Sequence, residues 1–184
     1  PLSSTAEFAP RGTPFTFRGR VLTRRWLDIP AEDMFAEALM SDGDFIIAGN
    51  YCLGSAGLQC NMTLGSLPTL DKDDDSDEGN AYLARYDVET GWQWAVSIAN
   101  QQEVLTFDMF VDEYDEIHIS VLFKELLDMN QTIFAGGSES SLAVMIFDEY
   151  GVFSTGFTAM SDEGVEPFGG FCQNSVGDTF ITFT

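Results

Sequence analysis

Basic residues are scarce in this sequence. The chain of 184 residues holds eight lysines and arginines against 30 aspartates and glutamates, and its formal net charge is −22. Phosphate backbones and anionic lipid headgroups repel such an acidic chain. We therefore expect neither nucleic acid nor an anionic membrane among its partners. The first residue is proline rather than methionine, which indicates a processed or truncated product, so the lack of a signal peptide says nothing about compartment.

Long apolar runs and histidine are also lacking. No stretch approaches the roughly 18 consecutive apolar residues of a membrane-spanning helix. His118 is the single histidine, and without a second one we expect a structural role for it rather than a zinc site. There is no nucleophile elbow, phosphate-binding loop or dinucleotide fingerprint. The sequence therefore predicts no enzyme and no membrane insertion.

Cysteine is limited to Cys52, Cys60 and Cys172. The first two bracket a short loop, which predicts a local disulfide in an oxidising compartment, with two reduced thiols as the alternative. Cys172 is left over, and we expect it to be buried or paired outside this segment.

The few basic residues gather near the start of the chain. Residues 1–30 carry five basic and two acidic groups, net +3, and residues 31–184 carry three and 28, net −25. Residues 1–18, with three prolines, are typical of an extended basic arm. Such an arm can attract the acidic body of another copy or neutralise its own.

From residue 19 to 184 the chain is repetitive. A shift of 72 residues aligns Phe35 with Phe107 and Ile47 with Ile119. Residues 31–40 could form a helix on propensity alone, but the aligned copy favours a strand, so we predict a strand over 34–40. Further predicted strands are 45–49, 81–87, 92–98, 104–111, 117–123, 142–147, 152–159, 166–172 and 179–183, with long loops over 52–79 and 124–140.

These strands form units over 34–98, 104–160 and, incompletely, 166–184. The predicted fold is all-β: a β-propeller-like array of four-stranded antiparallel sheets, with about two full blades and partial blades at both ends. A ring of about four to eight blades would need a longer chain or several chains. Trp92 and Trp94 are expected on one face of their strand, packed between sheets, with sugar stacking as the alternative.

Three segments carry a resemblance to known repeats. They are Asp42-Gly43-Asp44-Phe45-Ile46-Ile47-Ala48-Gly49, Asn80-Ala81-Tyr82-Leu83-Ala84-Arg85-Tyr86-Asp87 and Gly91-Trp92-Gln93-Trp94-Ala95. Residues 36–98, and less closely 104–160, resemble the bacterial-type β-propeller repeats of secreted and cell-surface proteins. The resemblance implies a propeller scaffold exposed outside the cell and no reaction.

One acidic stretch offers ligands for a hard cation. Alternating carboxylates, as in calcium loops, together with a neighbouring glutamate, predict a calcium site at Asp71, Asp73, Asp75, Asp77 and Glu78. The spacing does not match an EF-hand, since Ser76 stands where glycine is needed and Tyr82 where glutamate is needed. A solvated acidic loop is the alternative.

Two N-glycosylation sequons begin at Asn61 and Asn130, in the long loops of successive units. The acidic pairs Asp112/Glu113 and Asp115/Glu116 could imitate glycosidase carboxylates, but a hairpin turn favours solvated charge.

Three functions are consistent with these patterns. We favour a non-catalytic extracellular or cell-surface structural or adhesion module, part of a polymeric assembly, that contacts other protein subunits or copies of itself. The alternative is a calcium-assisted propeller that binds or cleaves carbohydrate, with glycans as partners. The third hypothesis is a receptor domain that binds protein through its long loops.

Overall fold

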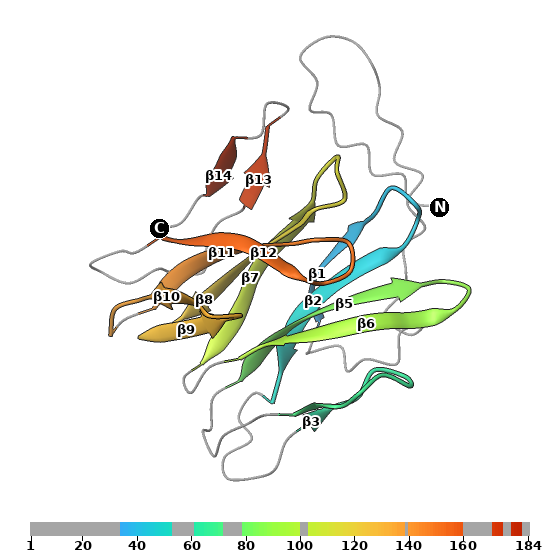
Figure 1. The fold of residues 1–184 in the computed structure, drawn as a ribbon, viewed down its shortest axis with the longest axis horizontal. Coiled ribbons are helices and arrows are strands. Elements are labelled where there is room, and N and C mark those ends of the chain that lie inside the picture. Colours follow the sequence, from blue (N-terminus) through green and yellow to red (C-terminus); the bar gives the residue numbers. More distant parts are fainter. Residues whose placement is uncertain are drawn as a thin grey trace, which may run out of the picture.

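A computed structural model describes residues 34–52, 61–71, 79–99, 103–138, 140–159, 171–174 and 178–181. Every regular element in these ranges is a β-strand (Figure 1). The strands are β1 (Met34–Leu39), β2 (Phe45–Tyr51), β3 (Asn61–Met62), β4 (Leu70–Asp71), β5 (Asn80–Asp87), β6 (Gly91–Ile98), β7 (Val104–Val111), β8 (Ile117–Phe123), β9 (Leu126–Met129), β10 (Thr132–Ala135), β11 (Ser141–Phe147), β12 (Phe153–Ala159), β13 (Phe171–Gln173) and β14 (Thr179–Ile181). None of the described residues belongs to a helix long and apolar enough to span a membrane.

The strands form two four-stranded antiparallel sheets with the same chain order. The first sheet has the order β1-β2-β5-β6, and the second runs β7-β8-β11-β12. This confirms the prediction of an all-β fold with antiparallel sheets. The helical alternative is wrong for residues 34–39, where β1 pairs with β2 over its length apart from one register shift.

Aspartate side chains close the turns between these strands. Asp87 Oδ1 accepts the amides of Glu89 and Thr90 at 2.7 and 2.6 Å. Asp148 Oδ1 accepts the amides of Tyr150 and Val152 at 3.0 and 2.8 Å. A short aspartate side chain can replace a backbone partner in this way and so favours a turn over continued strand. The turn signals in the sequence therefore act through local hydrogen bonds.

Both segments predicted as long loops contain short hairpins instead. In 124–140, β9 and β10 are joined by Asn130 and Gln131, whose φ angles are 50° and 70°. Positive φ at both central residues is the geometry of a type I′ two-residue hairpin turn, and neither residue is glycine. In the other segment, β3 pairs with β4.

Three apolar clusters follow the faces of the two sheets. The inter-sheet core joins Ile46 and Leu83 of the first sheet to Ile119 and Met145 of the second. The outer face of the first sheet carries a second cluster, in which Leu64 of the β3–β4 segment is buried. The outer face of the second sheet carries a third cluster, formed by Phe107, Leu122 and Leu142, with Ile181 of β14 packed against it.

The two sheets meet through unlike faces. Ile47 of the first sheet points to its outer face, whereas Ile119, which the 72-residue shift aligns with it, points into the inter-sheet core. Ile46 takes the core side in the first sheet. The face that one sheet turns inward is therefore the face that the other turns outward, so the packing is head to tail rather than mirror-like.

A buried polar contact ties β7 to β2 across this junction. The Thr106 amide donates to Asn50 Oδ1 at 2.7 Å, and the Thr106 hydroxyl donates to the Gly49 carbonyl at 2.8 Å. Both Asn50 and Thr106 are buried. Because buried polar groups are costly without partners, these two bonds favour a single position of the second sheet on the first.

The two tryptophans of β6 lie on opposite faces, contrary to the sequence prediction. Trp94 packs against the inter-sheet core, and Trp92 packs against the outer cluster of the first sheet. The pairing of β5 with β6 shifts between Arg85–Trp94 and Tyr86–Trp92, so Gln93 is an extra residue in β6. A β-bulge of this kind reverses the alternation of side chains.

Candidate functional site

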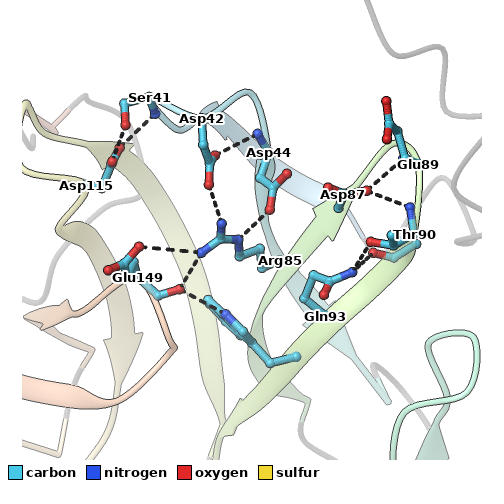
Figure 2. A network of polar contacts seen from close by, with 12 residues as sticks. Ser41, Asp42, Asp44, Arg85, Asp87, Glu89, Thr90, Gln93, Asp115 and Glu149 are labelled. Atoms are coloured by element: carbon cyan, nitrogen blue, oxygen red, sulfur yellow. Dashed lines mark hydrogen bonds and ion pairs between the residues drawn. The ribbon is translucent and has the colours of Figure 1, made fainter.

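Three turns surround a hollow at one end of the two sheets. The hollow measures about 510 Å³ and is lined by Asp42, Asp44, Arg85, Asp87, Gln93, Trp94 and Tyr150. The first two residues belong to the β1–β2 turn, and Tyr150 belongs to the β11–β12 turn of the second sheet. The site is therefore built at the junction of the two sheets (Figure 2).

Arg85 is the centre of the polar network around this hollow. Its Nε donates to Asp44 Oδ2 at 2.6 Å and its Nη2 to Asp42 Oδ2 at 2.5 Å. Its Nη1 donates to the Glu149 carbonyl at 3.0 Å. The planar guanidinium thus uses three nitrogens to join the first sheet's own turn to a turn of the second sheet (Figure 2).

Trp94 of the first sheet also contacts the β11–β12 turn. Its indole Nε1 donates to the Glu149 carbonyl at 3.1 Å, so this oxygen accepts two bonds from the first sheet. A Cβ placed on Gly151, whose φ is +77°, would lie 2.9 Å from the Trp94 ring. The β11–β12 turn can therefore approach the first sheet only because Gly151 has no side chain.

Partial burial sets the electrostatics of this network. Burial raises the pKa of Asp44, and the hydrogen bond from Arg85 only partly opposes it. Burial works against the charge of Arg85 as well, but the bond to Asp44 and the charges of Asp42, Asp44 and Glu149 outweigh it and raise the Arg85 pKa. The Arg85 and Asp44 side chains are only 13% and 12% exposed. Each charge is therefore stabilised by its partner and would be costly to bury alone.

The rim of the hollow is polar and aromatic. Backbone and hydroxyl hydrogen bonds from Thr90 hold the pKa of Asp87 below its usual value, so this carboxylate is ionised at neutral pH. A hydrogen bond to Glu149 raises the pKa of Tyr150, so its phenol keeps its proton. Gln93 Nε2 donates to Thr90 Oγ1 at 2.7 Å. The lining offers carboxylate acceptors and the Trp94 and Tyr150 rings, a combination that suits hydroxyl-rich ligands.

A second polar link joins the two sheets beside this network. Asp115 of the β7–β8 turn accepts the Ser41 amide through Oδ1 at 2.8 Å and the Ser41 hydroxyl through Oδ2 (Figure 2). These two bonds, the hydroxyl first, lower the pKa of Asp115 from its ordinary value of 3.8. The link is therefore strongest where Asp115 is ionised.

We expect Ser41→Ala to destabilise the protein in a pH-dependent way. The Asp115 pKa is lower in the folded state than its ordinary value of 3.8. The ionised Asp115 therefore contributes to the free energy of unfolding above pH 3.8, and this contribution is lost as the pH falls through the folded pKa. At pH 7 the variant should lose about 0.5–1 kcal/mol of unfolding free energy, and at pH 2 almost none. Urea denaturation at both pH values measures this, with Ser66→Ala as the control. An equal loss at pH 7 and pH 2 would contradict the assignment.

Most of the predicted calcium ligands lie outside the described residues. Asp73, Asp75, Asp77 and Glu78 fall there, and the calcium site stays a prediction. Asp71 is the last residue of β4 and pairs with Asn61.

The other predicted sites are partly described. Asn61 and Asn130 are both exposed. Cys52 is buried, but Cys60 lies outside the described residues, so their disulfide stays a prediction. Cys172 is exposed rather than buried, and its pairing outside this segment stays a prediction.

Several residues that the structure brings together have roles that were not predicted from the sequence. Arg85 was part of a repeat segment, and its contacts span 41–64 residues of sequence. Asp112 was expected to be solvated, yet its side chain is 6% exposed and contacts His118. The pattern of the predicted hairpin held a signal for the contact of Asp112 with His118. Phe110 and His118 are opposite each other in the β7–β8 hairpin, and this register places Asp112 at the closed end of the hairpin.

No protein-family model, curated protein or solved structure matches this chain. The resemblance to β-propeller repeats therefore stays a prediction, and the proposals below rest on the geometry of the molecule itself.

Proposed function

We propose that this chain is a non-catalytic extracellular structural or adhesion module, built as a β-propeller-like array that makes protein–protein contacts. The observation that carries the proposal is the head-to-tail packing of the two sheets, with Ile46 and Ile119 in one core and Ile47 outside it. Unlike faces can add further sheets, and the array then either closes into a ring or continues as an open filament.

The outer face of the second sheet supports continuation of the array. Ile181 of β14 already packs there against the cluster that includes Phe107, Leu122 and Leu142. Phe157 and Phe180 are 48% and 52% exposed, and Phe157 pairs with Val144 in the second sheet. Apolar groups on a sheet face are a typical docking surface for another sheet. A copy of the chain that docks here would make the assembly polymeric.

Sedimentation and electron microscopy test the polymeric part of the proposal. We expect the average mass to rise with protein concentration, and Phe157→Asp to suppress this rise by placing a charge in the contact. Val88→Asp is the matched control, because Val88 is similarly exposed, at 52%, in a turn of the first sheet. Monomers at every concentration would remove the polymeric clause, and an equal effect of both variants would remove the proposed surface.

An extracellular location predicts that the two sequons, whose Asn61 and Asn130 are exposed, carry N-glycans. Expression in a glycosylating secretory host, followed by enzymatic removal of N-glycans, should lower the apparent mass. If this decrease in apparent mass is absent from an Asn61→Gln/Asn130→Gln double variant, the N-glycans are attached at these two positions. Secreted protein without any decrease would count against glycosylation in that host.

A second candidate function is calcium-assisted carbohydrate binding or cleavage. It is supported by the hollow beside Arg85, where Asp87, Gln93 and two aromatic rings meet. A glycan array and calorimetry with calcium decide it. Glycan binding that Gln93→Ala weakens would support this candidate, and the absence of both glycan hits and calcium heat would end it.

A further inference from the structure

The closed end of the β7–β8 hairpin gathers three side chains that can bind a metal ion. Asp112 follows β7, Glu116 precedes β8, and His118 is the second residue of β8. One potential ligand atom from each lies within 4.8 Å of the other two. The hairpin turn itself brings them together, because the Asp112 amide donates to the Glu116 carbonyl at 3.0 Å.

His118 is held in one orientation and is not satisfied by its described neighbours. Its ring stacks on Phe110, with centroids 4.5 Å apart and planes 10° from parallel. Nε2 lies 3.1 Å from Asp112 Oδ2, whereas Nδ1 is buried and has no hydrogen-bond partner within the described part of the chain. The residue is 3% exposed. The two ring nitrogens point in different directions, so Nε2, which faces Asp112, is the nitrogen that can share an ion with the carboxylates.

Asp112 uses only one carboxylate oxygen for the turn. Its Oδ1 accepts the amides of Tyr114 and Glu116 at 2.8 and 3.0 Å. Asp148 makes the same kind of turn through Oδ1, and its turn has no histidine at the corresponding place, where Ser154 stands. The turn therefore does not require the contact of Oδ2 with His118. This oxygen is available as a ligand.

The charge of the cluster also favours a cation. Within the described residues, no lysine or arginine forms an ion pair with Asp112 or Glu116. Two carboxylates next to one imidazole leave net negative charge in a site where Asp112 and His118 are largely shielded from water. Asp112 is the buried carboxylate and Glu116 is exposed, and a buried charge is costly unless it is paired or coordinates a metal.

We propose that Asp112, Glu116 and His118 bind a divalent transition-metal ion of the zinc class. One imidazole nitrogen and two carboxylate oxygens form a ligand set suited to such ions, whereas calcium prefers six to eight oxygens. Three protein ligands leave the fourth tetrahedral position for water or for an oxygen of a bound molecule. The sequence pointed away from zinc because it has one histidine, and the structure supplies the two further ligands.

The single histidine makes the test direct. In a tag-free Cys172→Ser background, which removes a competing exposed thiol, zinc sulfate alone is titrated into protein labelled with ¹⁵N at histidine. We expect the imidazole resonances to move and saturate at one equivalent, with excess calcium unable to reverse the change. Unchanged imidazole resonances at saturating zinc would overturn the proposal.

Two exposed glutamates provide a matched pair of variants for calorimetry. Glu116→Gln should weaken zinc binding at least about tenfold, because even indirect supports of a metal site are worth that much. Glu113→Gln, in the same turn and also exposed, should leave it unchanged. Equal affinity in both variants would place the ion elsewhere and overturn the assignment. Neither result depends on self-association, which sedimentation measures separately.

Discussion

Arg85→Met is expected to lower the free energy of unfolding by about 3 kcal/mol, because it leaves the Asp44 carboxylate buried without its partner. Methionine fills much of the same volume, so the loss reports the charge rather than a cavity. The variant also loses the bond to the Glu149 carbonyl that ties the second sheet to the first. Urea denaturation measures the loss.

The double variant Arg85→Met/Asp44→Leu is the control for this interpretation. Since replacing both members of a buried pair by apolar residues is often close to neutral, the double variant should regain most of the lost stability. The Arg85→Met deficit should also shrink as the pH is lowered, because the raised Asp44 pKa favours the protonated, uncharged form in the folded state. A deficit independent of pH, with no recovery in the double variant, would contradict the pairing.

Gly151→Ala is expected to lower the free energy of unfolding by about 3 kcal/mol, from backbone strain and overpacking together. The φ of +77° disfavours any side chain, and the new Cβ would lie 2.9–3.0 Å from three atoms of the Trp94 ring. The turn would have to move away from the first sheet and weaken the bonds of the Glu149 carbonyl. Thermal and urea unfolding measure the effect.

Gly91 offers a matched control for this prediction. Its φ is +88°, but nothing lies within 4 Å of an added Cβ. Gly91→Ala should therefore cost only the backbone term, about 1 kcal/mol. In a Trp94→Ala background, Gly151→Ala should fall to the same cost. Equal losses for the two glycine variants would show that the contact with Trp94 has no energetic weight.

The strands and their turns could be predicted because their causes are local. Alternation of apolar and polar residues located β7 and β8 at their observed bounds, and aspartates such as Asp87 and Asp148 marked the turns that they close. The β9–β10 hairpin escaped prediction because Asn130 and Gln131 adopt positive φ without glycine. The two tryptophans were misplaced because one inserted residue, Gln93, reverses the faces of β6.

The functional residues depended on contacts that no local pattern encodes. Arg85 meets Glu149 across 64 residues of sequence, and only the packing of the two sheets decides which turn it reaches. The grouping of His118 with Asp112 and Glu116 required the hairpin register and the stacking on Phe110.

By itself, the sequence determined the strands of the two main sheets, most of the turns and the acidic charge, because each follows from short-range sterics, hydrogen bonding or composition. Only the tertiary structure decided which faces meet, where Trp92 and Trp94 point and which charges become partners. These outcomes depend on a bulge and on the fit of one sheet against another, and both are properties of the assembled chain rather than of any single segment.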